Sequence, residues 1–321
     1  MMQVSWDCCS TEHLLRPVCH TMLRSVFPVL NRAEDLSRKP YRVVYRIPSD
    51  YEVKITRVTQ ETQDIIRQGT NLIFSFAQFL VTLLPALGIG IGIGSQSMSG
   101  VPQVQPVYWS FFIWFLIYAG CSAYGIYQSL PAQRENDILR RVGLYTASAF
   151  IGVTAYALVA QFEIGSAWIL IAIFIWILAS LLVAIMLLTV DQSRLTKTEE
   201  YAVLAPVSLL LGWCSLAVFV NVAAILKDSG MLGTIETSFS LFLLLVAGSV
   251  ASVIIYKTKG NIWYTIPVIW GLIGVVIANI WQQPNTTVAG AAALAAIVLV
   301  GILVIVRKTA QEKSGRNGGC L

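Results

Sequence analysis

The chain alternates between long apolar stretches and shorter polar segments. Eight stretches of about 20 residues or more contain no Asp, Glu, Lys, Arg or His, and a helix of that length crosses the ~30 Å hydrocarbon core of a bilayer. The pattern therefore predicts an all-α integral membrane protein, an eight-transmembrane-helix bundle. The predicted spans are Asn71–Gly94, Val107–Gln128, Val142–Phe162, Ser166–Val190, Tyr201–Leu226, Ser238–Tyr256, Ile262–Gln282 and Thr287–Val306.

Composition supports this class and excludes a soluble protein. Only 12% of the 321 residues are charged and 56% are hydrophobic, whereas an average soluble domain carries roughly 25% charged residues. The net charge is +5, but the basic residues are spread over connecting segments. Because no soluble domain gathers them into a patch, we expect no nucleic-acid partner.

The basic residues also predict the orientation of the chain. Under the eight-span division, 21 of the 22 Lys and Arg residues fall on one side, and Lys227 is alone on the other. Cytoplasmic segments are enriched in Lys and Arg. We therefore expect a multi-pass protein of the plasma membrane with both termini in the cytoplasm.

Residues 1–70 differ from the rest of the chain. They mix both signs of charge, hold three cysteines and contain no apolar run long enough to span. The apolar core of a secretory signal is missing from Met1–Leu30. We expect a cytoplasmic extension in which Tyr51–Gly69 forms an amphipathic surface helix, with a partly disordered tail as the alternative.

Catalytic and metal-binding patterns are absent from the spans. Without His, Asp or Glu, no span can supply a familiar hydrolytic constellation or a histidine ligand for haem. The tail offers the ligand types Cys8, Cys9, His13, Cys19 and His20 without zinc-site spacing. We therefore predict a protein that is not an enzyme and that has neither a metal nor a cofactor. Cys121 and Cys214, inside spans, are expected to pack as small hydrophobes.

The first span ends in the sequence GIGIGIG, residues 88–94. A nucleotide-binding loop needs G-x-G-x-x-G between a strand and a helix, which does not fit a membrane segment. Gly88/Gly92 and Gly90/Gly94 instead form small-xxx-small pairs that let helices approach closely in lipid. We expect helix packing here, with some loosening of the helix after Pro85.

The nine tryptophans divide into two groups. Four lie near span ends, where amphipathic rings anchor a protein in the membrane interface: Trp109, Trp168, Trp263 and Trp281. Four others lie deeper: Trp114, Trp176, Trp213 and Trp270.

Two aromatic stripes carry the functional prediction. Phe111, Trp114 and Tyr118 share one face of the second span by their i, i+3, i+7 spacing. On the fifth span, helical spacing aligns Pro206, Leu210, Trp213, Ala217 and Asn221. Because a buried indole and a buried amide both seek hydrogen-bond partners, these faces should point inward. Periodicity alone leaves two alternatives open, simple helix packing and the wall of a ligand-binding site.

These stripes resemble the TspO/MBR family of tryptophan-rich sensory or translocator proteins. Residues 106–118, PVYWSFFIWFLIY, are similar to the start of the family's second helix, including its W-x-x-x-Y step. The order proline, tryptophan, asparagine at Pro206, Trp213 and Asn221 is similar to the fifth helix, and residues 127–134 resemble a loop of longer bacterial-type members. The loop Ser95–Pro106 lacks the tryptophan of a family-type lid.

The resemblance implies a division of the chain and a function. Residues 71–228 would form a TspO-like five-helix core, 229–306 three additional transmembrane helices, and 307–321 a short basic cytoplasmic tail. The core would bind a planar hydrophobic small molecule, tetrapyrrole-like or sterol-like, as a sensor, carrier or stress-linked regulator. The ligand-binding residues implied are Phe111, Trp114, Tyr118, Pro206, Trp213 and Asn221. A facilitative transporter of an apolar solute and a structural membrane protein without ligand are the alternatives, and a homo-oligomer is left open.

Overall fold

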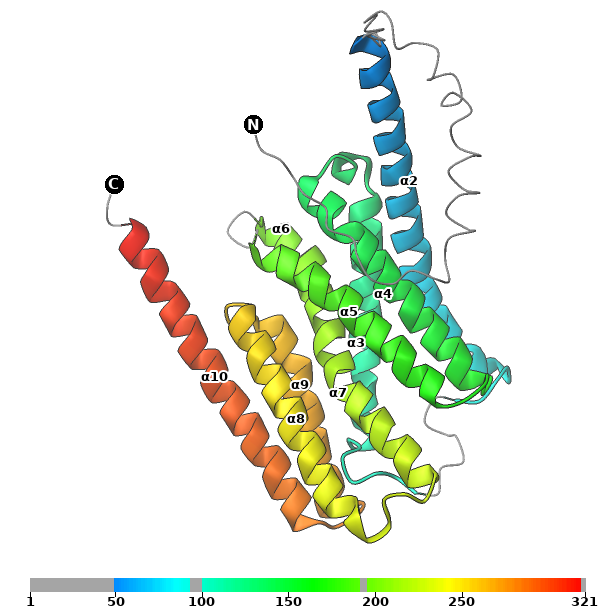
Figure 1. Cartoon of the computed structure of the whole chain (residues 1–321), viewed down its shortest axis with the longest axis vertical. Helices are drawn as coiled ribbons and strands as arrows, with labels where there is room; N and C mark the ends of the chain where they lie inside the picture. The colour runs from blue at the N-terminus through cyan, green and yellow to red at the C-terminus, as the bar shows by residue number, and fades with distance from the viewer. Residues whose placement is uncertain (1–48, 93–99, 191–194, 319–321) are drawn as a thin grey trace, which may run out of the picture. The chain divides into compact units, whose positions relative to one another are not determined.

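The computed structural model describes the backbone of residues 49–92, 100–190 and 195–318, and side chains from residue 60 to residue 312 within those ranges. In this part of the chain the regular elements are all helical (Figure 1). The long helices are α2 (Ser49–Thr82), α3 (Ile113–Ser129), α4 (Asp137–Gln161), α5 (Trp168–Val190), α7 (Ala205–Asp228), α8 (Glu236–Lys257), α9 (Ile262–Trp281) and α10 (Thr286–Gly318). Short helical turns, η3 (Tyr108–Phe112), α6 (Lys197–Glu199) and the π-turn η6 (Glu200–Leu204), precede α3 and α7.

Seven helices of the described residues are long and apolar enough to cross a membrane. They correspond to the second through eighth predicted spans, and α3 is extended at its start by η3. The chain is therefore an all-α multi-pass membrane protein. The count of eight is not confirmed, because α2 does not meet the same criterion of length and composition.

The first predicted span, Asn71–Gly94, is wrong as a single helix. Helix α2 ends at Thr82 and is followed by the short 3₁₀ turn Leu84–Leu87, which includes Pro85. Gly88 and Gly90 then adopt φ values of +76°, a left-handed conformation that glycine tolerates and that no α-helix contains. The glycines therefore make a turn. The backbone N–H of Ile91 donates to the carbonyl of Gln161 at the end of α4, at 2.9 Å.

Helix α2 enters the bundle earlier than the apolar pattern indicates. It runs parallel to α4, since three contacts pair the helices in the same order along both sequences. Arg140 Nη2 lies 2.7 Å from Asp64 Oδ2, Asn71 Nδ2 donates to the carbonyl of Gly143 at 2.7 Å, and Gln161 Nε2 donates to the carbonyl of Val81 at 3.0 Å. The segment Asp64–Val81 thus follows the whole of α4 from Arg140 on. The buried face of this segment is polar, which explains why the apolar stretch in the sequence does not begin at Asp64.

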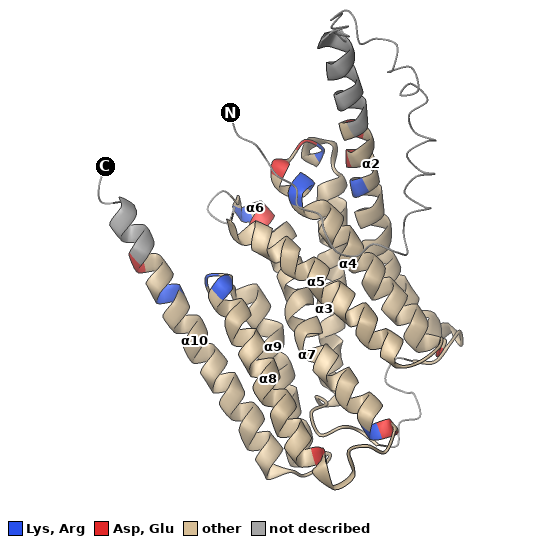
Figure 2. Cartoon of the chain, viewed as in Figure 1, with Lys and Arg blue, Asp and Glu red and all other residues tan. Residues whose placement is uncertain are grey.

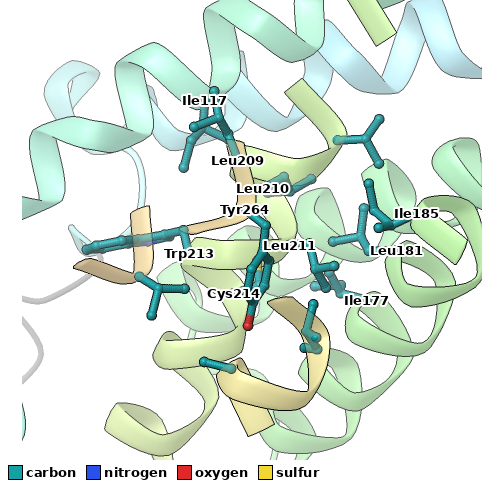
Figure 3. Packing of buried hydrophobic residues seen from close by; sticks show 14 of the residues in the cluster. Ile117, Ile177, Leu181, Ile185, Leu209, Leu210, Leu211, Trp213, Cys214 and Tyr264 are labelled. Atoms are coloured by element: carbon teal, nitrogen blue, oxygen red, sulfur yellow. The ribbon is translucent and has the colours of Figure 1, made fainter. Parts of the chain in front are cut away.

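Helix α7 lies at the centre of the bundle, in contact with α5 on one side and α9 on the other (Figure 1). Every residue from Ala205 to Ser215 is buried. Leu210, Leu211 and Cys214 lie among side chains from α3, α5 and α9, including Ile117, Leu181 and Tyr264 (Figure 3). Gly212 lets α9 approach closely, since a Cβ there would come within 2.6 Å of Pro267 Cγ.

Charged side chains of the described residues gather at the two ends of the helices (Figure 2). At the end where α4 and α7 finish lie Glu163, Lys227, Asp228 and Glu236. The remaining described Lys and Arg residues lie toward the opposite end, where α4 and α7 begin. The uncharged middle is what a hydrocarbon layer requires, because an unpaired charge there is costly.

Polar side chains set the start of several helices. The Asn136 side chain accepts from the N–H groups of Ile138 and Leu139, and Asn261 does the same for the first turn of α9. Thr196 and Glu199 form a reciprocal capping box. Each cap satisfies N–H groups that have no partner within the helix.

Candidate aromatic site between helices α3 and α7

The two predicted aromatic stripes meet between α3 and α7. Trp114 stacks on Tyr118 within α3, with ring centroids 5.0 Å apart and planes inclined by 21°. Trp213 of α7 lies edge-on to Trp114, at 6.2 Å and 81°, and edge-on to Phe111, at 5.7 Å and 87°. Such T-shaped pairs are each stabilised by about 0.5–1.5 kcal/mol beyond simple burial.

Trp213 is the innermost member of this cluster, since only 3% of its surface is exposed. Its indole Nε1–H has no hydrogen-bond partner among the described residues. Buried indole N–H groups usually find a partner, and leaving one without a partner costs about 1–3 kcal/mol. The sequence correctly predicted that this face points inward, but it did not predict a donor that lacks an acceptor.

A small cavity adjoins the cluster. Its volume is about 40 Å³, and its walls come from α7, from η3 and from the loop before η3. The lining residues are Pro106, Phe111, Trp213, Leu216, Ala217, Val220 and Asn221. Three of the six predicted site residues, Phe111, Trp213 and Asn221, therefore line one space.

Asn221, about two turns after Trp213 in α7, also lines this cavity and is fixed by two hydrogen bonds. Its Oδ1 accepts from the Tyr156 hydroxyl of α4 at 3.0 Å, and its Nδ2 donates to the carbonyl of Ala217 at 2.8 Å. The sequence indicated that Asn221 needs a partner. It did not identify Tyr156, because a single tyrosine on another span carries no signal of the pairing.

The other three predicted residues do not line the cavity. Trp114 packs against Trp213, which lines the cavity. Tyr118 is buried, stacks on Trp114 and also packs against Phe79 of α2, with ring centroids 6.0 Å apart. Pro206 lies two turns before Trp213, where it packs against α3 beside Gly120. Pro206 therefore packs α7 against α3 and does not line the cavity.

The loop before η3 is held in place by the last three helices. The N–H of Val107 donates to the carbonyl of Gly274 in α9, at 3.0 Å. Gln103 is the centre of a second set of bonds: its carbonyl accepts from Asn279 at 2.7 Å, and its Oε1 accepts from Asn285 at 3.0 Å and from Thr237 at 3.1 Å. Helices α8, α9 and α10 thus position the wall of the cavity that Pro106 forms.

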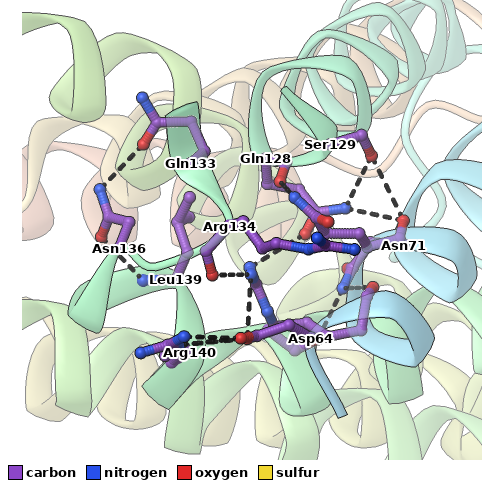
Figure 4. A network of polar contacts seen from close by, with 12 residues as sticks. Asp64, Asn71, Gln128, Ser129, Gln133, Arg134, Asn136, Leu139 and Arg140 are labelled. Atoms are coloured by element: carbon purple, nitrogen blue, oxygen red, sulfur yellow. Dashed lines mark hydrogen bonds and ion pairs between the residues drawn. The ribbon is translucent and has the colours of Figure 1, made fainter. Parts of the chain in front are cut away.

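A buried polar network, which the sequence did not predict, joins α2, α3 and α4 (Figure 4). Arg67 is 2% exposed and donates to Gln128 Oε1 at 3.2 Å and to the carbonyl of Arg134 at 2.9 Å. Asp64 bridges Arg67 and Arg140. Asn71 and Thr146 extend the network. Because buried charges are stable only when paired and hydrogen-bonded, this network fixes the register of α2 against α3 and α4.

The four tryptophans near span ends differ in their surroundings. Trp168 and Trp281 are exposed, whereas Trp109 packs edge-on to Trp270 at 5.4 Å and Trp263 edge-on to Tyr201 at 5.5 Å. Cys121 and Cys214 are free and fully buried, as predicted. The tail ligand types Cys8, Cys9, His13, Cys19 and His20 lie outside the described residues. Within the described residues, no group of three or more His, Cys, Asp or Glu could hold a metal ion.

Comparison with known proteins places the chain in a family. No curated protein and no solved structure matches it. A family model described as TSPO-like protein matches residues 65–305. The match begins in α2 at the buried polar network and continues through α8 and α9 into α10, so it extends beyond residues 71–228, the part of the sequence that resembles the family most clearly. The chain belongs to the family of TSPO-like proteins.

Proposed function

We propose that this TSPO-like membrane protein binds a planar hydrophobic small molecule, tetrapyrrole-like or sterol-like, at the aromatic site between α3 and α7. In this role it acts as a sensor or carrier and not as an enzyme. The observation that carries the proposal is Trp213. Its buried indole N–H has no partner among the described residues, and its side chain lines a cavity that Phe111 and Asn221 also line.

The composition of the site suits such a ligand. Phe111, Trp114 and Trp213 offer rings on which a conjugated system can stack. The indole N–H of Trp213 can donate to a ligand carbonyl or carboxylate, which would satisfy the donor that the protein leaves without a partner. Apolar pockets with one or two placed polar groups are the usual form of small-molecule sites.

A ligand of this size requires the site to open. The cavity of about 40 Å³ has room for about one water molecule, whereas small-molecule pockets typically measure about 300–1,000 Å³. Phe111 is the wall best able to move, because it is 37% exposed and lies in the short turn η3. We expect the Phe111 ring to swing toward the lipid, so that the ligand ring takes its place against Trp213.

Fluorescence titration with protoporphyrin in detergent micelles tests the proposal. We expect saturable quenching of tryptophan emission. Trp114→Leu and Trp213→Leu keep the site apolar but remove a stacking surface, so each should weaken binding roughly three- to tenfold on the scale of ~1.4 kcal/mol per decade. Trp281→Leu is the matched control, because Trp281 is 78% exposed and distant in sequence from both helices.

Two outcomes would contradict the proposal. Equal losses in all three variants would indicate general destabilisation, and absence of saturable binding by any tetrapyrrole or sterol would remove the site. In the second case, flux of an apolar solute into liposomes would test the alternative, a facilitative transporter.

We further propose that the protein lies in the plasma membrane with both termini in the cytoplasm. The unequal charge of the two ends supports this orientation, because the end with most of the described Lys and Arg should face the cytoplasm. A Ser229→Cys variant, made in a chain without other cysteines, should react with an impermeant maleimide on intact cells. A Glu312→Cys variant should react only after the membrane is broken, and the reverse pattern would invert the orientation.

A further inference from the structure

Ser110 carries a second buried polar group near the aromatic cavity. It lies in η3 directly before Phe111 and is fully buried. Its carbonyl accepts from the indole N–H of Trp270 at 2.9 Å, but its hydroxyl has no hydrogen-bond partner among the described residues. Because the large majority of buried side-chain polar atoms are hydrogen-bonded, the Ser110 hydroxyl is available to a group that the described residues do not supply.

Ser110 and Trp213 pack against the same side of α9. A Cβ at Gly274 would overlap the Ser110 hydroxyl and would lie 2.8 Å from Cβ of Pro106, a residue that lines the cavity. A Cβ at Gly271 would lie 3.5 Å from Cζ3 of Trp213. Because helix positions three residues apart are neighbours on one face, the two glycines place both side chains along one face of α9.

The free polar groups around the cavity favour a ligand that accepts hydrogen bonds. The indole N–H of Trp213 can only donate, and the hydroxyl of Ser110 can donate. Asn221 has the only side-chain carbonyl among the described lining residues, and its Oδ1 already accepts from Tyr156 at 3.0 Å. An acceptor atom can therefore satisfy either free group, whereas a ligand donor could pair only with the hydroxyl.

The cavity also lacks charge. None of the described residues that line it is Lys, Arg, His, Asp or Glu. An ionised carboxylate buried there would have no counter-charge, which is costly. A ketone, amide or ester carbonyl avoids this cost and still offers lone pairs to the two donors. The lining therefore favours an uncharged acceptor.

We propose that the aromatic site is specific for planar hydrophobic ligands that carry an uncharged carbonyl group, and that Ser110 donates to this group together with Trp213. The inference rests on the proposed function, because the ligand ring occupies the aromatic site after Phe111 moves outward. Ser110 precedes Phe111 in the same short turn, so the movement that admits the ring also gives the ligand access to the hydroxyl.

Two porphyrins that differ only in their acceptor groups test the proposal. Mesoporphyrin IX dimethyl ester carries ester carbonyls on the ring and alkyl pattern of etioporphyrin III, which has none. In tryptophan-quenching titrations of the full chain in detergent micelles, the ester should bind about tenfold tighter than etioporphyrin III, as two added hydrogen bonds predict.

Variants that remove one donor at a time assign the preference to its residues. Ser110→Ala removes the hydroxyl, and Trp213→Phe removes the N–H but keeps an aromatic ring. Each should weaken binding of the ester about threefold and leave etioporphyrin III unchanged, and the double variant should bind both porphyrins equally. Ser249→Ala is the matched control, because Ser249 is exposed on α8 and its hydroxyl donates to the carbonyl of Leu245.

The outcomes separate this inference from the proposed function. Equal affinity of the unmodified chain for the two porphyrins would overturn the preference for a carbonyl and leave the aromatic site in place. Absence of saturable binding by either porphyrin would overturn both. Equal weakening of both porphyrins by Ser110→Ala would show a structural role for Ser110 and would contradict its assignment as a donor.

Thermal unfolding provides the check on folding. Ser110→Ala should not lower the unfolding midpoint, because removing a hydroxyl without a partner leaves no other polar group unpaired.

Discussion

The two halves of α7 differ in packing. From Ala205 to Ser215 every residue is buried, and the helix is surrounded by α3, α5 and α9. From Leu216 to Asp228 most residues are partly exposed, and both the aromatic cavity and a second pocket of about 380 Å³, which Asn221 and Ala224 help to line, lie along this stretch. Both halves belong to one continuous helix of similar apolarity, so the difference comes from their neighbours.

The difference shows how one helix can serve stability and binding at once. The first half lies at the end of the bundle where the Arg67 network joins α2, α3 and α4, and where Asn136 donates to Glu199 at 2.8 Å to connect α4 with α6. At this end polar groups are paired and space is filled. At the other end the aromatic cavity lies beside Asn221, and under the proposed function this is the space that the ligand enters. Changes at the first end should alter stability, and changes at the second should alter binding.

The largest effect is expected for Arg67→Leu. The substitution removes the donor to Gln128 Oε1 and to the Arg134 carbonyl and takes one of two partners from Asp64. Breaking a buried charged pair costs about 3–5 kcal/mol, so the midpoint of thermal unfolding in detergent should fall strongly. The affinity of the folded fraction for protoporphyrin should stay within about twofold, which is a small change on the scale of ~1.4 kcal/mol per tenfold.

Arg141→Leu is the control for this variant. Arg141 is exposed on the same helix as Arg140, and exposed substitutions usually change stability by less than about 0.5 kcal/mol. A similar loss of thermal stability in both variants would show that the Arg67 network does not stabilise the end of the bundle where α2, α3 and α4 meet.

A smaller effect is expected for Gly212→Ala, which sharpens the comparison within α7 itself. The added Cβ would overlap the carbonyl of Tyr264 and lie 2.6 Å from Pro267 Cγ, so α9 must shift. Overpacking of this kind costs about 1–3 kcal/mol. Gly248→Ala on α8 is the matched control, because a Cβ there meets no atom within 4 Å. Equal unfolding midpoints for the two variants would contradict the close packing described for α7 and α9.

The smallest effect on stability, with a clear effect on binding, is expected for Ala217→Val. Two added methyl groups would project into the aromatic cavity of about 40 Å³, and cavity-filling substitutions commonly raise stability by about 0.5–2 kcal/mol. Protoporphyrin affinity should fall at least tenfold because the ligand and the valine compete for the same volume. Val218→Ile, one residue further and outside the lining, should leave the affinity unchanged. If Ala217→Val binds normally, the ligand does not use this cavity.

Most helices could be predicted from the sequence because the membrane imposes a simple rule. Spans such as Ser166–Val190 and Ile262–Gln282 differ by at most two residues from α5 and α9, since apolar length alone defines a crossing segment. The same rule failed at α2, whose buried face carries Arg67, Asn71, Ser75 and Gln78. These polar residues are stable inside the bundle because α3 and α4 supply their hydrogen-bond partners. Those partners are distant in sequence, so the pattern around α2 alone does not reveal them.

The candidate site could be predicted only in part. Helical spacing placed Trp114 and Trp213 on facing stripes, and their meeting is what the structure shows. Spacing did not separate Pro206, which packs, from Asn221, which lines the cavity, because both lie on the same stripe. The pocket of about 380 Å³ at the end of α4 was not predicted, since its lining residues come from the end of α4, the start of α5 and the last turns of α7, which are far apart in the chain.

The central claim is that a ligand binds beside Trp213, and the indole N–H signals of ¹⁵N-tryptophan-labelled protein test it most directly. Trp213 and Trp263 both have a buried Nε1 without a hydrogen-bond partner among the described residues, but only Trp213 lines the aromatic cavity. On titration with protoporphyrin, the Trp213 signal, assigned by its loss in Trp213→Leu, should shift and saturate while the Trp263 signal stays in place. A Trp213 signal that does not move during saturable binding, or equal shifts of both signals, would contradict the account.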